Sequence, residues 1–353
     1  MAIDQPVGIR FRIWPTLIAV AIILAIGAVI IWLDWEQVQK LSEGADWRFI
    51  IAALFLTAVS YFLGSASFVF MLSLFGVHLE WPYLMRVSWL SVVQHNLIAF
   101  PAALSFRILL LGGCGVASSR TVGASMLLVY FKDLALFALI PFSMLFVVLS
   151  GNFSGGGVAV LLAVAIVVAV GMIVASLIYF NRRLRAPVFA AVCRMWGRLF
   201  RRDISASVKR FEEALDSGLR HLRHRRRAGL ILGGLILGDV VATIATLYFC
   251  FIALGIQILP GVLVAGFNLG VTLSVIPFIP TQLGFQDASM AGILALFGVP
   301  FSYGILGAIL FRAIFYFVPF VFSLPLYWNT VHETARRARC PRPASAEKEA
   351  PGK

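Results

Sequence analysis

Residues 96–107 read NLIAFPAALSFR and residues 277–287 read PFIPTQLGFQD, and these two stretches decide the fold. The first interrupts the apolar stretch 83–111, and the second interrupts the apolar stretch 261–297. Proline breaks or kinks a helix because it has no amide hydrogen and its ring clashes with the preceding turn. We therefore expect helix breaks at Pro101, and at Pro277 and Pro280 with Gly284. Backbone freed at membrane depth is tolerated only where protein or water covers it, so both stretches should line a central chamber.

The rest of the sequence predicts an all-α, polytopic integral membrane protein. Its 353 residues are 61% hydrophobic and 13% charged, whereas a soluble domain is about 45–50% apolar and about 25% charged. A hydrocarbon core about 30 Å thick is crossed by about 20 apolar residues. The predicted spans are 13–33, 48–75, 120–149, 158–180, 228–254 and 301–328. With the two broken stretches, these make about eight membrane-inserted segments.

The positive charge predicts membrane topology rather than nucleic-acid binding. The net charge is +13, and fourteen of the 29 Lys and Arg residues lie in the loop 181–227. Because such residues gather in cytoplasmic loops, we expect this loop and both termini in the cytoplasm of a bacterial inner membrane. Within the loop, Phe211, Leu215, Leu219 and Leu222 recur at helical spacing. This spacing predicts an amphipathic helix on an anionic leaflet, with a solvated linker as the alternative.

The side of the membrane on which each predicted span begins and ends predicts an inverted repeat. The stretch 83–111 must enter and leave on one face, as a re-entrant hairpin bent at Pro101, whereas 261–297 is either a second hairpin from the opposite face or two short spans. The unit 48–149 then recurs inverted over 228–328, as in many secondary transporters. Phe131-Lys132 echoes Phe311-Arg312, and Gly115-Val116 echoes Gly298-Val299.

We predict a single membrane domain over residues 1–328. It comprises a first half (13–180), the basic loop (181–227) and a second half (228–328). Residues 329–353 are predicted to form a disordered cytoplasmic tail.

Charged residues inside the predicted spans mark candidate functional positions, because a charge at the bilayer centre costs at least about 2.5 kcal/mol. The charged and polar candidates are Arg107, Lys132, Asp133, Asp239, Asp287, Arg312, His95, Asn96, Asn268 and Gln282. Lys132, Asp133 and Asp239 either couple transport to an ion or form structural ion pairs. Asp287 could pair with Arg312, and Arg107 either lines a cavity or snorkels to the interface.

Few features suggest catalysis or metal binding. The four cysteines are scattered singly, and His95 beside Asn96 is more typical of a satisfied polar pair than of a metal ligand. The sequence has no P-loop motif and no nucleophile spaced with a base. We therefore expect no metal, no cofactor and no enzymatic activity.

The two broken stretches resemble the motifs of a known family. Residues 96–107 with Gly115-Val116 resemble the first motif of the lysylphosphatidylglycerol synthase transmembrane, or flippase-like, family. Residues 277–287 with Arg312, Tyr316 and Pro319 are similar to its second motif. Leu104 and Ser105 stand where the family commonly has glycine and glutamate, and Asp287 stands where it usually has glutamate. The resemblance extends from the first span to Trp328.

The resemblance implies a domain that moves a phospholipid or related amphiphile between leaflets. We expect Arg107 and Arg312, with Asn96, Gln282 and Asp287, to hold the headgroup of an anionic phospholipid or isoprenoid lipid. Longer relatives carry a soluble synthase domain that we do not expect here. The alternatives are an ion-coupled transporter of a small solute, an accessory protein of hopanoid or isoprenoid-lipid transport, and a membrane enzyme. No partner protein can be named.

Overall fold

The computed structural model describes residues 44–97, 100–149, 226–275 and 285–339, together with isolated residues between 163 and 219. The chain divides into two compact units, Met1–Ala45 and Asp46–Lys353, and all that follows concerns the second. Its described elements are all helices. They are α3 (Trp47–Leu74), α4 (Trp81–Leu97), α5 (Phe100–Gly113), α6 (Ser118–Leu149), α10 (Arg226–Ala253), α11 (Pro260–Val275), α12 (Phe285–Leu296), α13 (Phe301–Arg312), the π-helix η1 (Ala313–Phe317) and α14 (Val318–Arg339). The predicted span 13–33 lies outside the described residues.

Four stretches of helix are long and apolar enough to cross a membrane: Trp47–Leu74, Ser118–Pro141, Arg227–Ala253 and Phe301–Thr334. They confirm four of the predicted spans. Large apolar side chains such as Phe55, Leu230 and Phe322 remain exposed on them, as expected for surfaces that contact lipid tails. The prediction of an all-α polytopic membrane protein is therefore confirmed.

Helices α4 and α5 form an antiparallel hairpin, as predicted for 83–111. The Tyr83 hydroxyl near the start of α4 donates to the carbonyl of Leu110 near the end of α5, and Ser91 contacts Arg107 further in. The arms have 17 and 14 residues, or about 25 and 21 Å at about 1.5 Å per residue, and so fall short of a full span. Pro101 lies in the first turn of α5, where its missing amide hydrogen costs no helical bond.

Helices α11 and α12 form the second hairpin. A Cβ added to Gly266 would lie 2.8 Å from Leu294, and one added to Gly270 would lie 3.1 Å from Met290, so the two helices run antiparallel. With 16 and 12 residues they are shorter still than the arms of the first hairpin. A re-entrant hairpin and two short spans both pair these helices antiparallel, so both alternatives for residues 261–297 stay predictions. The break between them, with Pro277, Pro280, Gln282 and Gly284, lies outside the described residues.

Four glycines show that the two repeat units, 48–149 and 228–328, share one design; from here on, 'unit' means one of these repeats. Gly76, Gly115, Gly255 and Gly298 have φ angles of 71°, 80°, 71° and 82° and lie two residues after the ends of α3, α5, α10 and α12. Each ends its helix in the same way: the glycine amide donates to the carbonyl three residues back, and the next amide donates five residues back, as Val77 does to Leu72. This is the Schellman motif, which requires a left-handed residue. The motif at matching positions confirms the inverted repeat.

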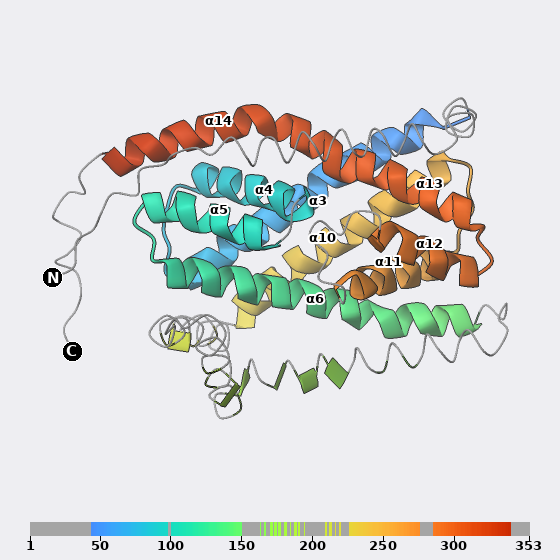
Figure 1. The fold of residues 1–353 in the computed structure, drawn as a ribbon, viewed down its shortest axis with the longest axis horizontal. Helices are drawn as coiled ribbons and strands as arrows, with labels where there is room; N and C mark the ends of the chain where they lie inside the picture. Colours follow the sequence, from blue (N-terminus) through green and yellow to red (C-terminus); the bar gives the residue numbers. More distant parts are fainter. Residues whose placement is uncertain are drawn as a thin grey trace. The chain divides into compact units, whose positions relative to one another are not determined.

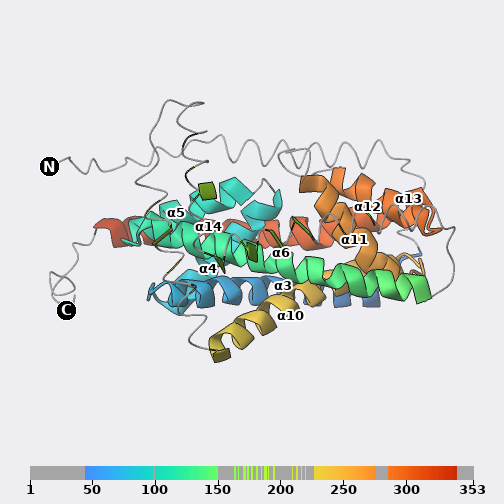
Figure 2. The same cartoon turned by 90° about the horizontal axis from the view of Figure 1, so that it is seen from below.

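The two units are inverted about the crossing of α3 and α10. The amide of Asp46, at the start of α3, donates to the carbonyl of Ala253 at the end of α10, so the two helices are antiparallel. Gly64 faces Asp239 and Gly238 faces Leu63, which allows the helices to approach closely. The first hairpin packs at one end of this pair and the second at the other, each in its own hydrophobic cluster (Figures 1 and 2).

The closing helix of the second unit differs from the prediction. It runs without interruption through α13, η1 and α14 to Arg339. The predicted disordered tail is therefore wrong for 329–339, because Tyr83 and Arg86 of the first hairpin hold this part of the helix. The Tyr83 and Thr334 hydroxyls are 2.9 Å apart, and Arg86 pairs with Glu333 at 2.8 Å.

Candidate functional site

Arg107 is enclosed by three neighbouring helices. On α5, its Nε donates to the Ser91 hydroxyl of α4 at 2.7 Å, and one terminal nitrogen donates to the Ser125 hydroxyl of α6 at 3.2 Å. The guanidinium carbon lies 3.9 Å from the centre of the Phe68 ring of α3. The side chain is 5% exposed, so Arg107 does not snorkel to the interface. We call Phe68, Ser91 and Ser125 the Arg107 cage.

The Arg107 cage contains no carboxylate. Among the described residues, no acid lies within ion-pair distance of this guanidinium. Ser88 and Thr121 lie one helical turn from Ser91 and Ser125, and their buried hydroxyls have no hydrogen-bond partner in the described part of the chain. The cage therefore combines an uncompensated cation with free hydroxyls close by.

A second polar cluster occupies the middle of the bundle. The Lys132 ammonium of α6 forms an ion pair with Asp239 of α10, with Nζ 2.6 Å from Oδ2, and the Ser60 hydroxyl of α3 donates to Asp239 Oδ1 at 2.6 Å. The hydroxyls of Ser60 and Thr243 are 3.0 Å apart. Ser60, Asp239 and Lys132 each lie near the midpoint of a long helix. The predicted pairing of Asp239 with a basic residue is confirmed.

The inner end of α4 reaches this central cluster. Asn96 donates to the Tyr61 hydroxyl at 2.9 Å, and Tyr61 donates to the backbone carbonyl of Phe315 in η1 at 2.9 Å. The exposed ring of His95 is close enough to Lys132 and Arg107 for both charges to act on it. Residues of the first hairpin, the opening helix and the closing helix therefore meet here.

Arg312 belongs to a third cluster, in the second unit. Its Nε lies 2.5 Å from Asp287 Oδ2 of α12, with side-chain exposures of 11% and 16%. The guanidinium also lies 5.2 Å from the centre of the Tyr316 ring. The predicted pair of Asp287 and Arg312 is confirmed. Arg107 and Arg312 make no mutual contact among the described interactions; each is held within its own unit.

The remaining predicted site residues are Asp133, Asn268 and Gln282. Asp133 is half-buried on α6 and makes no hydrogen bond or ion pair within the described part of the chain. Asn268 is buried on α11. Gln282 lies outside the described residues. Among the described residues, no three His, Cys, Asp or Glu side chains are grouped to bind a metal ion.

The sequence did not single out the hydroxyl residues of these clusters. Ser60, Ser91, Ser125 and Thr243 are common residue types in membrane helices, where a hydroxyl often bonds only to its own helix. Helical spacing offered one signal, since Ser88 and Ser91, like Thr121 and Ser125, share a helix face. Without knowing which helices meet, that signal could not be linked to Arg107.

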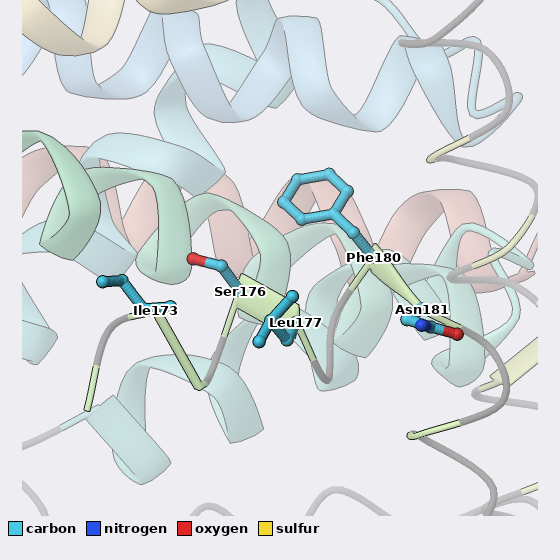
Figure 3. Close-up of a pocket in the computed structure, with 5 residues that line it drawn as sticks. All are labelled: Ile173, Ser176, Leu177, Phe180 and Asn181. Carbon is cyan, nitrogen blue, oxygen red and sulfur yellow. The ribbon is translucent and has the colours of Figure 1, made fainter. Parts of the chain in front are cut away.

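An open pocket of about 430 Å³ lies elsewhere, lined by Ile173, Ser176, Leu177, Phe180 and Asn181 (Figure 3). The Ser176 and Tyr130 hydroxyls are hydrogen-bonded, so this segment packs on α6. Its lining residues include none of the charged side chains described above. We therefore place the candidate site at the Arg107 cage and the central cluster.

Comparison with known proteins identifies the family. The model of the family described as the lysylphosphatidylglycerol synthase TM region matches residues 16–323. A UPF0104 membrane protein from Methanothermobacter thermautotrophicus (strain Delta H) is 24% identical over 117 residues, which are 33% of this chain and 32% of that protein. The alignment thus covers about a third of that relative. The match to the family model covers most of the chain, which therefore belongs to the family of the lysylphosphatidylglycerol synthase TM region.

Proposed function

We propose that this protein moves an anionic lipid between the two leaflets of its membrane, with Arg107 as the main contact to the headgroup phosphate. The observation that carries the proposal is the Arg107 cage, in which a buried guanidinium has hydroxyl and aromatic neighbours but no carboxylate. A family named for a lipid synthase's membrane region supports a lipid as the substrate.

The charge balance favours an anionic ligand. A buried cation without a partner is costly in a membrane protein, so such residues are rare and mark functional sites. Lys132 is balanced by Asp239, and Arg312 by Asp287. Arg107 has no such balance, and a guanidinium matches the geometry of a phosphate with two parallel hydrogen bonds. A phosphate that binds here would supply the missing charge.

The free hydroxyls indicate how the site accommodates the rest of a headgroup. Ser88 and Thr121 are fully buried and can each donate and accept hydrogen bonds. They lie one turn from the cage toward the outer end of the first hairpin, where α4 begins and α5 ends. A headgroup that enters from that end would meet them before it reaches Arg107.

The proposal assigns Arg312 a different role from Arg107. Because Arg312 already pairs with Asp287, a phosphate must compete with this carboxylate for it. Asn96 likewise hydrogen-bonds to Tyr61. We propose that these groups contact the headgroup only after the clusters rearrange. Nothing in the proposal requires a chemical step, and the protein acts without catalysing a reaction.

Leaflet exchange in reconstituted vesicles tests the proposal. Fluorescent phosphatidylglycerol, phosphatidylcholine and an isoprenyl phosphate are incorporated separately, and exchange is followed by reduction of the label in the outer leaflet. We expect the protein to speed exchange of phosphatidylglycerol or isoprenyl phosphate, and Arg107→Met to slow it at least about tenfold, equivalent to about 1.4 kcal/mol.

Arg120→Met is the matched control. Arg120 is an exposed arginine at the start of α6 whose nitrogen lies 3.4 Å from the Gly76 carbonyl, and it touches neither polar cluster. Exchange of the control should match that of the unaltered protein. Equal exchange by Arg107→Met and Arg120→Met would remove the headgroup role of Arg107, and no acceleration of any of the three lipids would remove the translocase proposal.

A further inference from the structure

The ion pair at the centre of the bundle joins the two repeats on their axis of inversion. Ser60 lies sixteen residues before Gly76, and Asp239 lies sixteen residues before Gly255, so the two residues occupy equivalent positions of α3 and α10. Their side chains are hydrogen-bonded to each other. One unit supplies serine at this position and the other supplies aspartate. The repeat itself therefore does not require a carboxylate here.

The two partners of the pair differ in their access to the surroundings. The Asp239 side chain is 5% exposed, whereas that of Lys132 is 32% exposed although Lys132 lies near the midpoint of α6. Charged side chains at this depth face protein or water rather than lipid tails. The ammonium of Lys132 is thus the accessible half of the pair, and the carboxylate of Asp239 is the enclosed half.

The chemical balance of this pair links a proton to an anion. With Asp239 ionised the pair is neutral, and an anion placed beside Lys132 would be repelled by the negative carboxylate of Asp239. If a proton adds to Asp239, Lys132 is left as an uncompensated cation at the centre of the membrane, which is costly unless an anion accompanies it. The proton and the anion each favour binding of the other, and by thermodynamic linkage the effect is reciprocal.

We propose that Lys132 and Asp239 form a proton-coupling site, at which one proton and one anionic headgroup bind together and are released together. The inference rests on the proposed lipid-moving function and adds its driving force. A proton from water bonds to a carboxylate oxygen of Asp239, Lys132 remains an ammonium, and the headgroup phosphate takes the place of the carboxylate beside it. When the phosphate departs, the proton leaves to water and the ion pair re-forms.

The surroundings of Asp239 leave few other groups to take this role. From α3 the neighbours are Ser60 and Tyr61, and the Tyr61 hydroxyl is already bonded to Asn96 and Phe315. From α6 the neighbour is Lys132, with Asp133 adjacent to it. The residues of α11 include no titratable side chain, and Arg312 of α13 is paired with Asp287. His95 of α4 lies near enough to Lys132 for the two groups to interact electrostatically.

A ratio of one proton to one lipid predicts how transport responds to pH and to membrane voltage. One proton moving with one singly charged phosphodiester carries no net charge, so transport should respond to a pH difference and not to membrane voltage. In vesicles with a pH difference, we expect labelled phosphatidylglycerol to accumulate in the leaflet that faces the alkaline compartment. A potassium diffusion potential set with valinomycin, at equal pH, should leave the distribution even.

The decisive variant is Asp239→Asn, which resembles the protonated carboxyl and keeps its size. Exchange should continue, but accumulation across a pH difference should be lost, and voltage should now shift the distribution because the anion moves without a proton. Glu333→Gln is the control, since Glu333 lies near the end of α14, where it pairs with Arg86. It should behave as the unaltered protein does.

The outcomes separate this inference from the proposed function. Exchange that ignores the pH difference, in both the unaltered protein and Asp239→Asn, would overturn proton coupling and leave the translocase intact. No exchange at all would overturn both. If Asp239→Asn does not fold, proton uptake by the unaltered protein in detergent is measured with a pH-indicator dye as dihexanoyl phosphatidylglycerol is added. We expect about one proton per lipid bound, and no uptake would overturn the coupling.

Discussion

The two hairpins occupy equivalent positions in the repeat, yet only the first has a polar interior. Counted from the glycines that end the helices, Arg107 corresponds to Met290, Ser91 to Gly270, Ser125 to Ala308 and Phe68 to Leu247. Where Arg107 contacts Ser91, a Cβ on Gly270 would lie 3.1 Å from Met290. The same crossing of helices is thus closed by a hydrogen-bonded cation in one unit and by close apolar packing in the other.

This comparison makes the second hairpin an internal control for the first. The second hairpin forms with the uncharged Met290 at the position that corresponds to Arg107. A hairpin of this kind therefore does not need an arginine there in order to form. The hydroxyls of Ser91 and Ser125 are present where the guanidinium is present and are replaced by Gly270 and Ala308 where it is absent. The cage is therefore matched to its arginine, which is the pattern expected of a binding site rather than of a structural necessity.

The ion pair of Asp287 and Arg312 in the second unit has no charged counterpart in the first unit. Asp287 and Arg312 correspond by the same counting to Leu104 and Val129 in the first unit, so the predicted echo of Phe131-Lys132 in Phe311-Arg312 is out of register by three residues. Arg107 of the first unit therefore has no acid beside it among the described residues, whereas Arg312 of the second unit is paired with Asp287. The two arginines, which the sequence presented as equals, should respond differently to substitution.

The largest effect should follow Arg312→Ala. The substitution leaves Asp287 nearly buried without its partner, and breaking a buried pair costs about 3–5 kcal/mol. The double variant Asp287→Leu with Arg312→Val reproduces the first unit and should recover most of the loss. Thermal unfolding in detergent measures both. A double variant no more stable than Arg312→Ala would show that the pair is not the cause.

A smaller effect is expected for Gly270→Leu. A side chain at this position meets the backbone of Met290, and overpacking typically costs about 1–3 kcal/mol. Gly292→Leu on α12 is the matched control, because a Cβ there has no atom within 4 Å. If both variants unfold at the same temperature, the close approach of the second hairpin is not required for stability.

Arg107→Met reproduces the second hairpin in the first. Its stability should change by less than about 1 kcal/mol, since relief of the buried charge offsets the lost bonds to Ser91 and Ser125. Leaflet exchange should fall by the tenfold stated above. A strongly destabilised Arg107→Met protein with normal exchange per folded molecule would reverse the comparison and make the arginine structural.

The smallest effect is expected for Arg86→Ala, at the contact between the first hairpin and the end of α14. The pair of Arg86 and Glu333 is 31% and 28% exposed, and such pairs contribute about 0–1 kcal/mol. A double-mutant cycle with Glu333→Ala measures the coupling. A value above about 2 kcal/mol would mean that α14 clamps the first hairpin far more firmly than an exposed pair allows.

Membrane insertion and the limits of three of the described long helices follow from the sequence. The apolar stretches predicted α3, α6 and α10 to within two residues at each end, because a span is a local property of length and hydropathy. Pro101 lies beside the break between α4 and α5, as predicted, and the Gly115 and Gly298 echo indicated the repeat. Gly76 and Gly255 carry the same signal.

Which charges meet was decided only by the tertiary structure. Lys132 and Asp239 are distant in sequence. Asp287 and Arg312 are likewise distant in sequence from the helices that enclose Arg107. No local sequence pattern states which helix faces pack together. The hydroxyl cage depends on where α3, α4 and α6 converge. Helix formation is governed by neighbouring residues along the chain, whereas partners of a buried charge are set by how helices cross, and that crossing separates the free arginine from the paired one.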